Sequence, residues 1–196
     1  MLAPVCVTPP AELPVSLDEA KAHLRIDFGD DDPYVMGLIS AATAHLDGWS
    51  GILGRALVTQ TWRQSLPAFP GCGVIRLPLA PVQAVTEVTY RDGDGSEQVL
   101  DAGVYSSVLV DALGPYVRRC SGCSWPATAP MDDAVAVTFT AGYGGPGEVP
   151  QAIRHAILLL MGHWYANREP VNIGNITSNL DFAVTALLAP FRHVGL

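Results

Sequence analysis

The sequence predicts an α+β fold, in which a small bundle of about four helices carries an antiparallel β subdomain inserted between the second and third helices. Changes in hydrophobic period support this division. Residues 15–56 and 142–196 place apolar side chains at helical spacing, whereas residues 57–141 form short β-rich runs separated by turn residues. The prolines of residues 1–14 predict an extended arm before the helical core.

The first two helices carry recognisable start signals. Ser16 and Glu19 form an S-x-x-E capping box, in which each residue satisfies a backbone amide of the other, and this helix is expected to end near residues 28–29. An aspartate run followed by Pro33 predicts the start of the second helix, since proline suits a first helical turn. Its apolar spacing continues to Trp49.

About six short strands are expected in the inserted region, and RDGDGS at residues 91–96 is a strong hairpin signal. A third helix is predicted over residues 149–168. A polar loop at residues 174–178 and a last helix at residues 179–188 follow, and Pro190 ends that helix.

The composition argues for an ordered protein that is partly covered by partners. Apolar residues make up 49% of the 196 residues and charged residues only 15%, against roughly 25% in a typical domain. The formal net charge is −8 and Lys21 is the only lysine, so no basic nucleic-acid-binding face is expected. No apolar run is long enough to predict a membrane span, and residues 1–14 do not read as a signal peptide, so cytoplasmic synthesis is expected.

A glycine fingerprint, G-x-G-x-x-G, lies between the last predicted strand and the third helix, at Gly142, Gly144 and Gly147. In a βαβ unit this spacing binds a dinucleotide. Here no second parallel strand follows the helix, and Glu148 places a carboxylate where the pyrophosphate would lie. The sequence therefore predicts a turn and no nucleotide cofactor.

Other candidate chemical sites are incomplete. Cys120 and Cys123 form one C-x-x-C, which supplies two of the four ligands of a structural zinc site and lacks the thioredoxin-like context of a redox motif. The calcium-like spacing of residues 92–96 lacks the required glycine, because Glu97 occupies that position. No metal, cofactor or catalytic residue is predicted. A small zinc or redox enzyme that uses the two cysteines stays open as an alternative.

The third helix has apolar residues on two sides. Its inner face is expected to hold Ile153, Ala156, Ile157, Leu160 and Trp164. Leu158, Met161 and Tyr165 form a second apolar stripe. This stripe either packs within the protein itself or contacts another subunit, and a subunit interface is predicted at these three residues.

Stretches along most of the chain, taken in order, carry a family resemblance. They are VSLDEAKAHLRID (15–27), GRALVTQTW (54–62), LPLAPVQAVTEVTYRDGDG (77–95), VAVTFTAGYG (135–144), VPQAIRHAILLLMGHWYANRE (149–169) and LLAPFR (187–192). Together they resemble the head–tail connector (adaptor) proteins of tailed phages and of phage-derived gene transfer agents.

The resemblance implies a structural protein without enzyme activity, made in the bacterial cytoplasm and incorporated at the head–tail junction of a virion or phage-like particle. It implies a homo-oligomeric ring, usually twelvefold, between the portal protein and a stopper or tail-terminator protein. DNA would pass through the lumen without specific binding, and no membrane is involved. A different ring component, such as a stopper or tail-completion protein, is an alternative.

The resemblance also implies that the C-terminal segment docks on the portal. The residues expected to dock are Leu187, Leu188, Pro190, Phe191 and Arg192. An apolar tail with one cation suits an anchor, because aromatic and arginine side chains are common interface hot spots. The competing interpretation is that this tail folds back onto the second helix.

Overall fold

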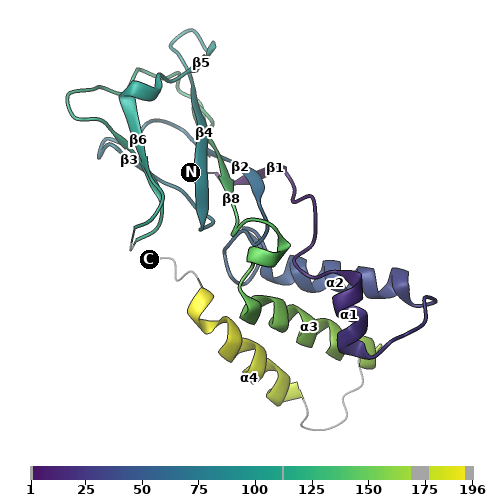
Figure 1. Cartoon of the computed structure of the whole chain (residues 1–196). Coiled ribbons are helices and arrows are strands. Elements are labelled where there is room, and N and C mark those ends of the chain that lie inside the picture. Colours follow the sequence, from purple (N-terminus) through teal and green to yellow (C-terminus); the bar gives the residue numbers. More distant parts are fainter. Residues whose placement is uncertain (1, 112, 169–176, 193–196) are drawn as a thin grey trace. The chain divides into compact units, whose positions relative to one another are not determined.

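The structure is a computed structural model that describes residues 2–111, 113–168 and 177–192. It contains both helices and antiparallel sheets (Figure 1), so the predicted α+β class is confirmed. The chain forms two compact units. The β unit comprises residues 1–11 and 59–143, and the helical unit comprises residues 12–58 and 144–196.

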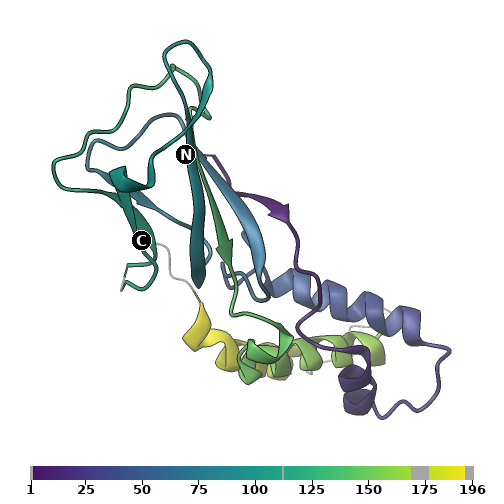
Figure 2. The same ribbon diagram turned by 45° about the horizontal axis from the view of Figure 1, so that its top comes forward.

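Within the described residues of the helical unit there are four α-helices: α1 (Leu17–Leu24), α2 (Asp32–Leu46), α3 (Gln151–Ala166) and α4 (Thr177–Leu188). The short 3-10 helix η2 (Pro146–Glu148) precedes α3, and a second one, η3 (Ala189–Phe191), follows α4. α3 contacts α1 and α2, and it also contacts α4, which lies beside it in Figures 1 and 2. α3 is therefore the central helix of this unit.

The core of the helical unit comes from the apolar stripes of these helices. Of the five residues predicted for the inner face of α3, four are fully or nearly buried, and Trp164 is half-buried. The buried residues of α2 recur at helical spacing, at Val35, Ile39, Ala42 and Leu46. The hydrophobic period therefore identified the faces of these two helices correctly.

Two helix ends differ from the sequence expectation. α1 ends at Leu24, because Arg25 adopts a left-handed conformation with φ of 58° and breaks the helical hydrogen bonding. α2 ends at Leu46, because Asp47 is extended and its carboxylate accepts a hydrogen bond from the amide of Leu57 at 2.7 Å. The extension of the α2 stripe to Trp49 was therefore wrong, and that side chain is 52% exposed.

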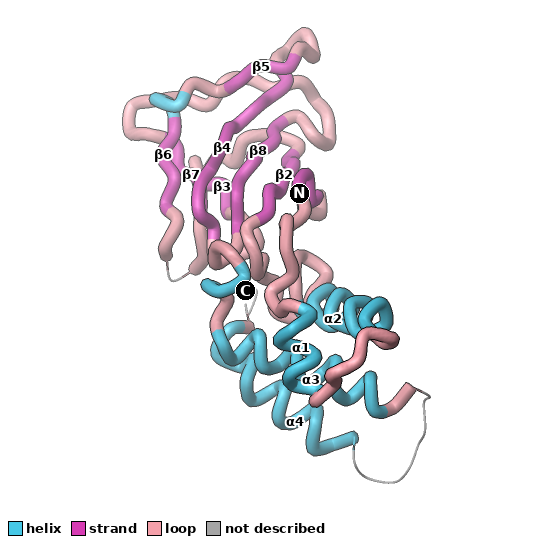
Figure 3. Tube along the Cα trace, turned by 45° about the vertical axis from the view of Figure 1, so that its right-hand side comes forward, coloured by secondary structure: helices cyan, strands magenta, loops and turns pink. Residues whose placement is uncertain are grey.

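The described part of the β unit forms two antiparallel sheets, and Figure 3 shows their strands. The five-stranded sheet has the order β1-β2-β8-β4-β5. Its strands are β1 (Val5–Thr8), β2 (Gln60–Leu66), β8 (Val135–Ala141), β4 (Val82–Arg91) and β5 (Glu97–Val99). The three-stranded sheet has the order β3-β7-β6, with β3 (Val74–Arg76), β7 (Tyr116–Arg119) and β6 (Tyr105–Val108), the last preceded by η1 (Ala102–Val104).

The hairpin predicted at residues 91–96 joins β4 to β5. Its turn is closed by Asp92, whose carboxylate accepts hydrogen bonds from the amides of Asp94 and Ser96 at 3.1 and 3.0 Å. The N-terminal arm also joins the sheet, because β1 pairs with β2. Part of the segment expected as an extended arm is therefore an edge strand of the β unit.

Candidate functional site

The second apolar stripe of α3 lies mostly inside the protein. Leu158 is 6% exposed and Met161 is fully buried, while Tyr165 is half-buried. α3 is contacted by helices on more than one side, which explains why two of its faces are apolar. Of the three residues predicted at a subunit interface, only Tyr165 offers a partly open side chain.

Tyr165 belongs to a surface cluster that we call the tyrosine–arginine cluster, made of Asp31, Tyr34, Tyr165 and Arg168. The Tyr165 hydroxyl donates a hydrogen bond to Oδ2 of Asp31, and Nη2 of Arg168 lies 3.0 Å from the same oxygen. The Arg168 guanidinium carbon stands 4.7 Å from the Tyr34 ring centroid and 5.2 Å from that of Tyr165. These contacts join the start of α2 to the end of α3.

The contacts in this cluster shift the pKa values of Asp31 and Tyr165. The hydrogen bond from Tyr165, together with the charge of Arg168, holds the pKa of Asp31 below its ordinary value. The same hydrogen bond raises the pKa of Tyr165, because the carboxylate opposes a second negative charge. The cluster therefore favours an ionised Asp31 and a neutral Tyr165.

The predicted portal-docking residues are divided between core and surface. Leu188 is 1% exposed, and Leu187 and Phe191 are half-buried. The backbone carbonyl of Phe191 accepts a hydrogen bond from Nε of Arg55, which follows α2 in the chain. Pro190 and Arg192 are exposed. The segment is thus anchored to its own helical unit through Leu188 and Phe191, and it leaves two side chains open.

Long-range ion pairs hold α1 in place, and the sequence did not reveal them. Nη2 of Arg154 in α3 lies 2.6 Å from Oε2 of Glu19, and Nζ of Lys21 lies 2.6 Å from Oδ1 of Asp32. Ser16 caps α1 through the Glu19 amide, as predicted. The Glu19 side chain reaches α3, a contact that local spacing could not predict because the partners are 135 residues apart.

The glycine fingerprint forms a packed turn before α3. The Glu148 carboxylate accepts a hydrogen bond from the Gly145 amide at 2.7 Å. Gly144 has φ of +135°, and a Cβ atom there would lie 1.6 Å from Oε2 of Glu148. Every pair of described strands is antiparallel, whereas a dinucleotide fold needs parallel strands. Close packing against the Glu148 side chain therefore explains why residue 144 is a glycine.

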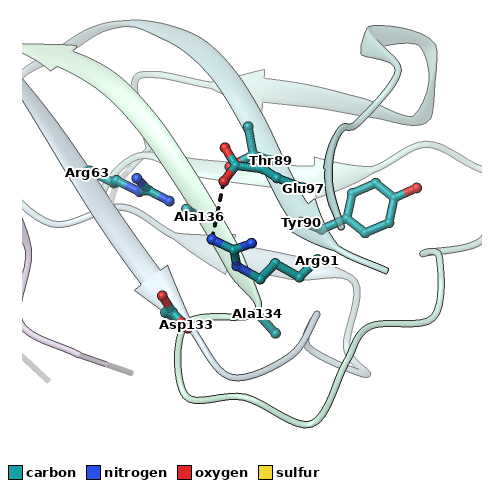
Figure 4. Close-up of a pocket in the computed structure, with 8 residues that line it drawn as sticks. All are labelled: Arg63, Thr89, Tyr90, Arg91, Glu97, Asp133, Ala134 and Ala136. Carbon is teal, nitrogen blue, oxygen red and sulfur yellow. Dashed lines mark ion pairs between the residues drawn. The ribbon is translucent and has the colours of Figure 1, made fainter. Parts of the chain in front are cut away.

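A shallow depression lies on the five-stranded sheet (Figure 4). Arg63, Asp133 and the ion pair of Arg91 with Glu97 line it, and Nη2 of Arg91 lies 3.5 Å from Oε2 of Glu97. Its enclosed volume is about 0 Å³, far below the roughly 300 Å³ at which small-molecule sites begin. Within the described residues, no group of three or more histidine, cysteine, aspartate or glutamate side chains could hold a metal ion. None of the described helices is both long and apolar enough to span a membrane.

Comparison with known proteins gives a consistent result. The family model described as "Phage gp6-like head-tail connector protein" matches residues 14–98, from the start of the helical unit into β5. No curated protein matches the sequence significantly.

Three solved structures resemble the chain over its full length. A chain in "Neck of empty GTA particle computed with C6 symmetry" has a TM-score of 0.80 and 26% identity. A chain in "Virion of native gene transfer agent (GTA) particle" gives 0.79 and 26%, and one in "Neck of native GTA particle computed with C12 symmetry" gives 0.74 and 27%. In each case 100% of this chain and 97% of the other are covered. The family match over residues 14–98 and these likenesses to gene transfer agent neck chains confirm the resemblance to head–tail connector proteins that the sequence shows.

Proposed function

We propose that the protein is a structural head–tail connector that forms a ring at the neck of a phage-like particle. The observation that carries this proposal is the likeness, over the whole of this chain and 97% of the other, to chains of gene transfer agent necks. Both units of the chain take part in that likeness, so it does not rest on a common helical motif alone. A connector acts through surfaces, and we infer that the protein has no enzymatic role.

We further propose that the ring is twelvefold, as in the neck described with C12 symmetry, and that it joins the portal protein to a stopper or tail-terminator protein. DNA would pass through its lumen without specific binding. The net charge of −8 with a single lysine supports this passage, because phosphate affinity comes from lysine and arginine contacts.

Portal docking is assigned to the exposed side of the C-terminal segment. Leu188 is buried and anchors the segment together with the backbone carbonyl of Phe191, whereas the half-buried Phe191 side chain and the exposed Arg192 side chain remain available to a partner. The tyrosine–arginine cluster is the part of α3 proposed to face a neighbouring subunit, because Leu158 and Met161 are already covered. An aromatic and arginine surface of this kind is typical of interface hot spots.

The function is tested by producing particles without the chain and supplying it again from a plasmid. Loss of the chain should give DNA-filled heads and separate tails, and the wild-type chain should restore joined particles. Normal tailed particles without the chain would contradict the proposal. If heads also fail to retain DNA, and purified protein closes portal-bearing heads without tails, the chain is a stopper instead.

The docking surface is tested in the same system with paired variants. Phe191→Ala combined with Arg192→Glu should leave the thermal stability of the protein nearly unchanged but prevent head–tail joining. Leu188→Ala is the control for the anchor, and it should lower stability because it leaves a cavity in the core. If the double variant joins heads to tails as well as the wild-type chain does, the C-terminal segment is not part of the docking surface.

A further inference from the structure

Two thiols stand at the ends of one tight turn in the β unit. The amide of Cys123 donates a hydrogen bond to the carbonyl of Cys120 at 3.2 Å, immediately after β7. Gly122 has φ of +79°, which is the third-position geometry of a type II turn. A β-turn brings its first and last Cα atoms within about 7 Å, and a disulfide spans Cα atoms about 4.4–6.8 Å apart.

Neighbouring groups fix this turn before any bond forms between the sulfurs. The Cys120 amide donates to the carbonyl of Val104 at 2.9 Å, and Nη1 of Arg119 donates to the carbonyl of Cys123. Both cysteines are free and partly exposed. A small oxidant can therefore reach them, and joining them requires little rearrangement of the backbone.

We propose that Cys120 and Cys123 form a reversible dithiol–disulfide site that reacts with small-molecule disulfides such as oxidised glutathione. One cysteine thiolate attacks a sulfur of the small disulfide, forms a mixed disulfide and releases one small thiolate. The other cysteine thiolate then attacks the protein sulfur of that mixed disulfide and releases the second small thiolate. The two protein thiols lose two electrons and two protons, and one small disulfide becomes two thiols.

The proposed location of the protein suggests when this site would react. Thiols stay reduced in the cytoplasm, where the chain would be made, and oxidise outside the cell, where a particle would be released. The internal bond would then lock the turn after β7. This timing rests on the proposed function, whereas the chemistry of the site does not.

Cys72 is the alternative disulfide partner for Cys120 or Cys123. Gly73 pairs with Arg119, because the Arg119 amide donates to the Gly73 carbonyl at 2.9 Å, so Cys72 lies at the same end of the three-stranded sheet. Trypsin separates the alternatives. Cys120 and Cys123 share the peptide of residues 120–154, whereas Cys72 lies in the peptide of residues 64–76.

The test uses the full-length protein, reduced and then equilibrated with mixtures of oxidised and reduced glutathione. After alkylation, the peptide of residues 120–154 should lose the mass of two hydrogen atoms and resist alkylation. The variant Cys6→Ser with Cys72→Ser should behave identically. Cys120→Ser and Cys123→Ser should each stop at a glutathione adduct.

Two results would overturn the proposal. One is a cross-link between the peptides of residues 64–76 and 120–154. The other is a glutathione adduct without an internal disulfide in the Cys6→Ser, Cys72→Ser variant. Circular dichroism of each variant checks that it is folded. Because the readout is the mass of the purified protein, the outcome is independent of whether the chain joins heads to tails.

Discussion

Leu158 and Met161 show that the spacing of apolar residues on a helix does not reveal what covers them. Their spacing on the helical wheel predicted a second apolar face, and α3 has that face. The sequence left open whether another subunit or the protein itself covers it. Both side chains are buried, and that outcome depends on how the other helices pack against α3, which helical periodicity does not determine.

Leu158→Ala is therefore expected to destabilise the isolated protein by about 2–5 kcal/mol, because it removes packed methyl groups and leaves a cavity. The measurement is urea unfolding of the purified chain, followed by circular dichroism. Met36→Ala on α2 is the matched control, since Met36 is 41% exposed and its loss should change stability by less than about 0.5 kcal/mol. If Leu158→Ala is as mild as Met36→Ala, the side chain is not part of the core.

The tyrosine–arginine cluster gives a prediction about pH. The pKa of Asp31 is lowered in the folded state, so its contribution is present above the ordinary value of 3.8 and is lost as pH falls through the lower folded pKa. The pKa of Tyr165 is raised, so its contribution is present below 10.0 and is lost as pH rises through the higher folded pKa. Asp32, the neighbouring carboxylate, is paired with Lys21 at 2.6 Å.

Tyr165→Phe should accordingly lower the urea midpoint at neutral pH, and the difference from wild type should shrink at both acid and strongly alkaline pH. Tyr34→Phe is the control, because it keeps the ring beneath the Arg168 guanidinium and leaves the hydrogen bond to Asp31 intact. A difference between Tyr165→Phe and wild type that stays constant from acid to alkaline pH would show that the hydroxyl does not act through Asp31.

At the scale of elements, the sequence predicted most helices and the main hairpin, because these depend on local period and turn chemistry. Helix ends and side-chain contacts that depend on residues elsewhere in the chain were less predictable. α2 ends where Asp47 meets the amide of Leu57, and Glu19 binds Arg154 across 135 residues. The pairing of β1 with β2 was also not evident, since short β-branched runs carry no information about their partner strand.

The turn before α3 provides the element-scale prediction. Gly144→Ala should destabilise the protein by about 1–3 kcal/mol, because φ is +135° and that conformation strains other residues. The new Cβ would also displace the Glu148 carboxylate from the Gly145 amide. Gly147→Ala is the control in the same turn, as a Cβ there meets nothing within 4 Å. Equal thermal midpoints for the two variants would exclude this packing role.

At the scale of the whole molecule, the order of several segments along the chain indicated the resemblance to head–tail connectors better than any single motif did. The family model matches residues 14–98, and the neck chains of gene transfer agents are similar over all of this chain. The candidate interfaces were harder to assign from sequence. Burial within one protomer and burial between two protomers both select apolar residues, and only the folded chain shows that Leu188 is an internal anchor.

The most direct test of the connector assignment is cryo-electron microscopy of particles that contain this chain, with the β unit and the helical unit fitted into the map separately. Both units should fit a ring of repeated density between head and tail, and this density should be missing from particles made without the chain. A neck fully explained by other proteins, with this chain located elsewhere in the particle or absent from it, would contradict the connector assignment.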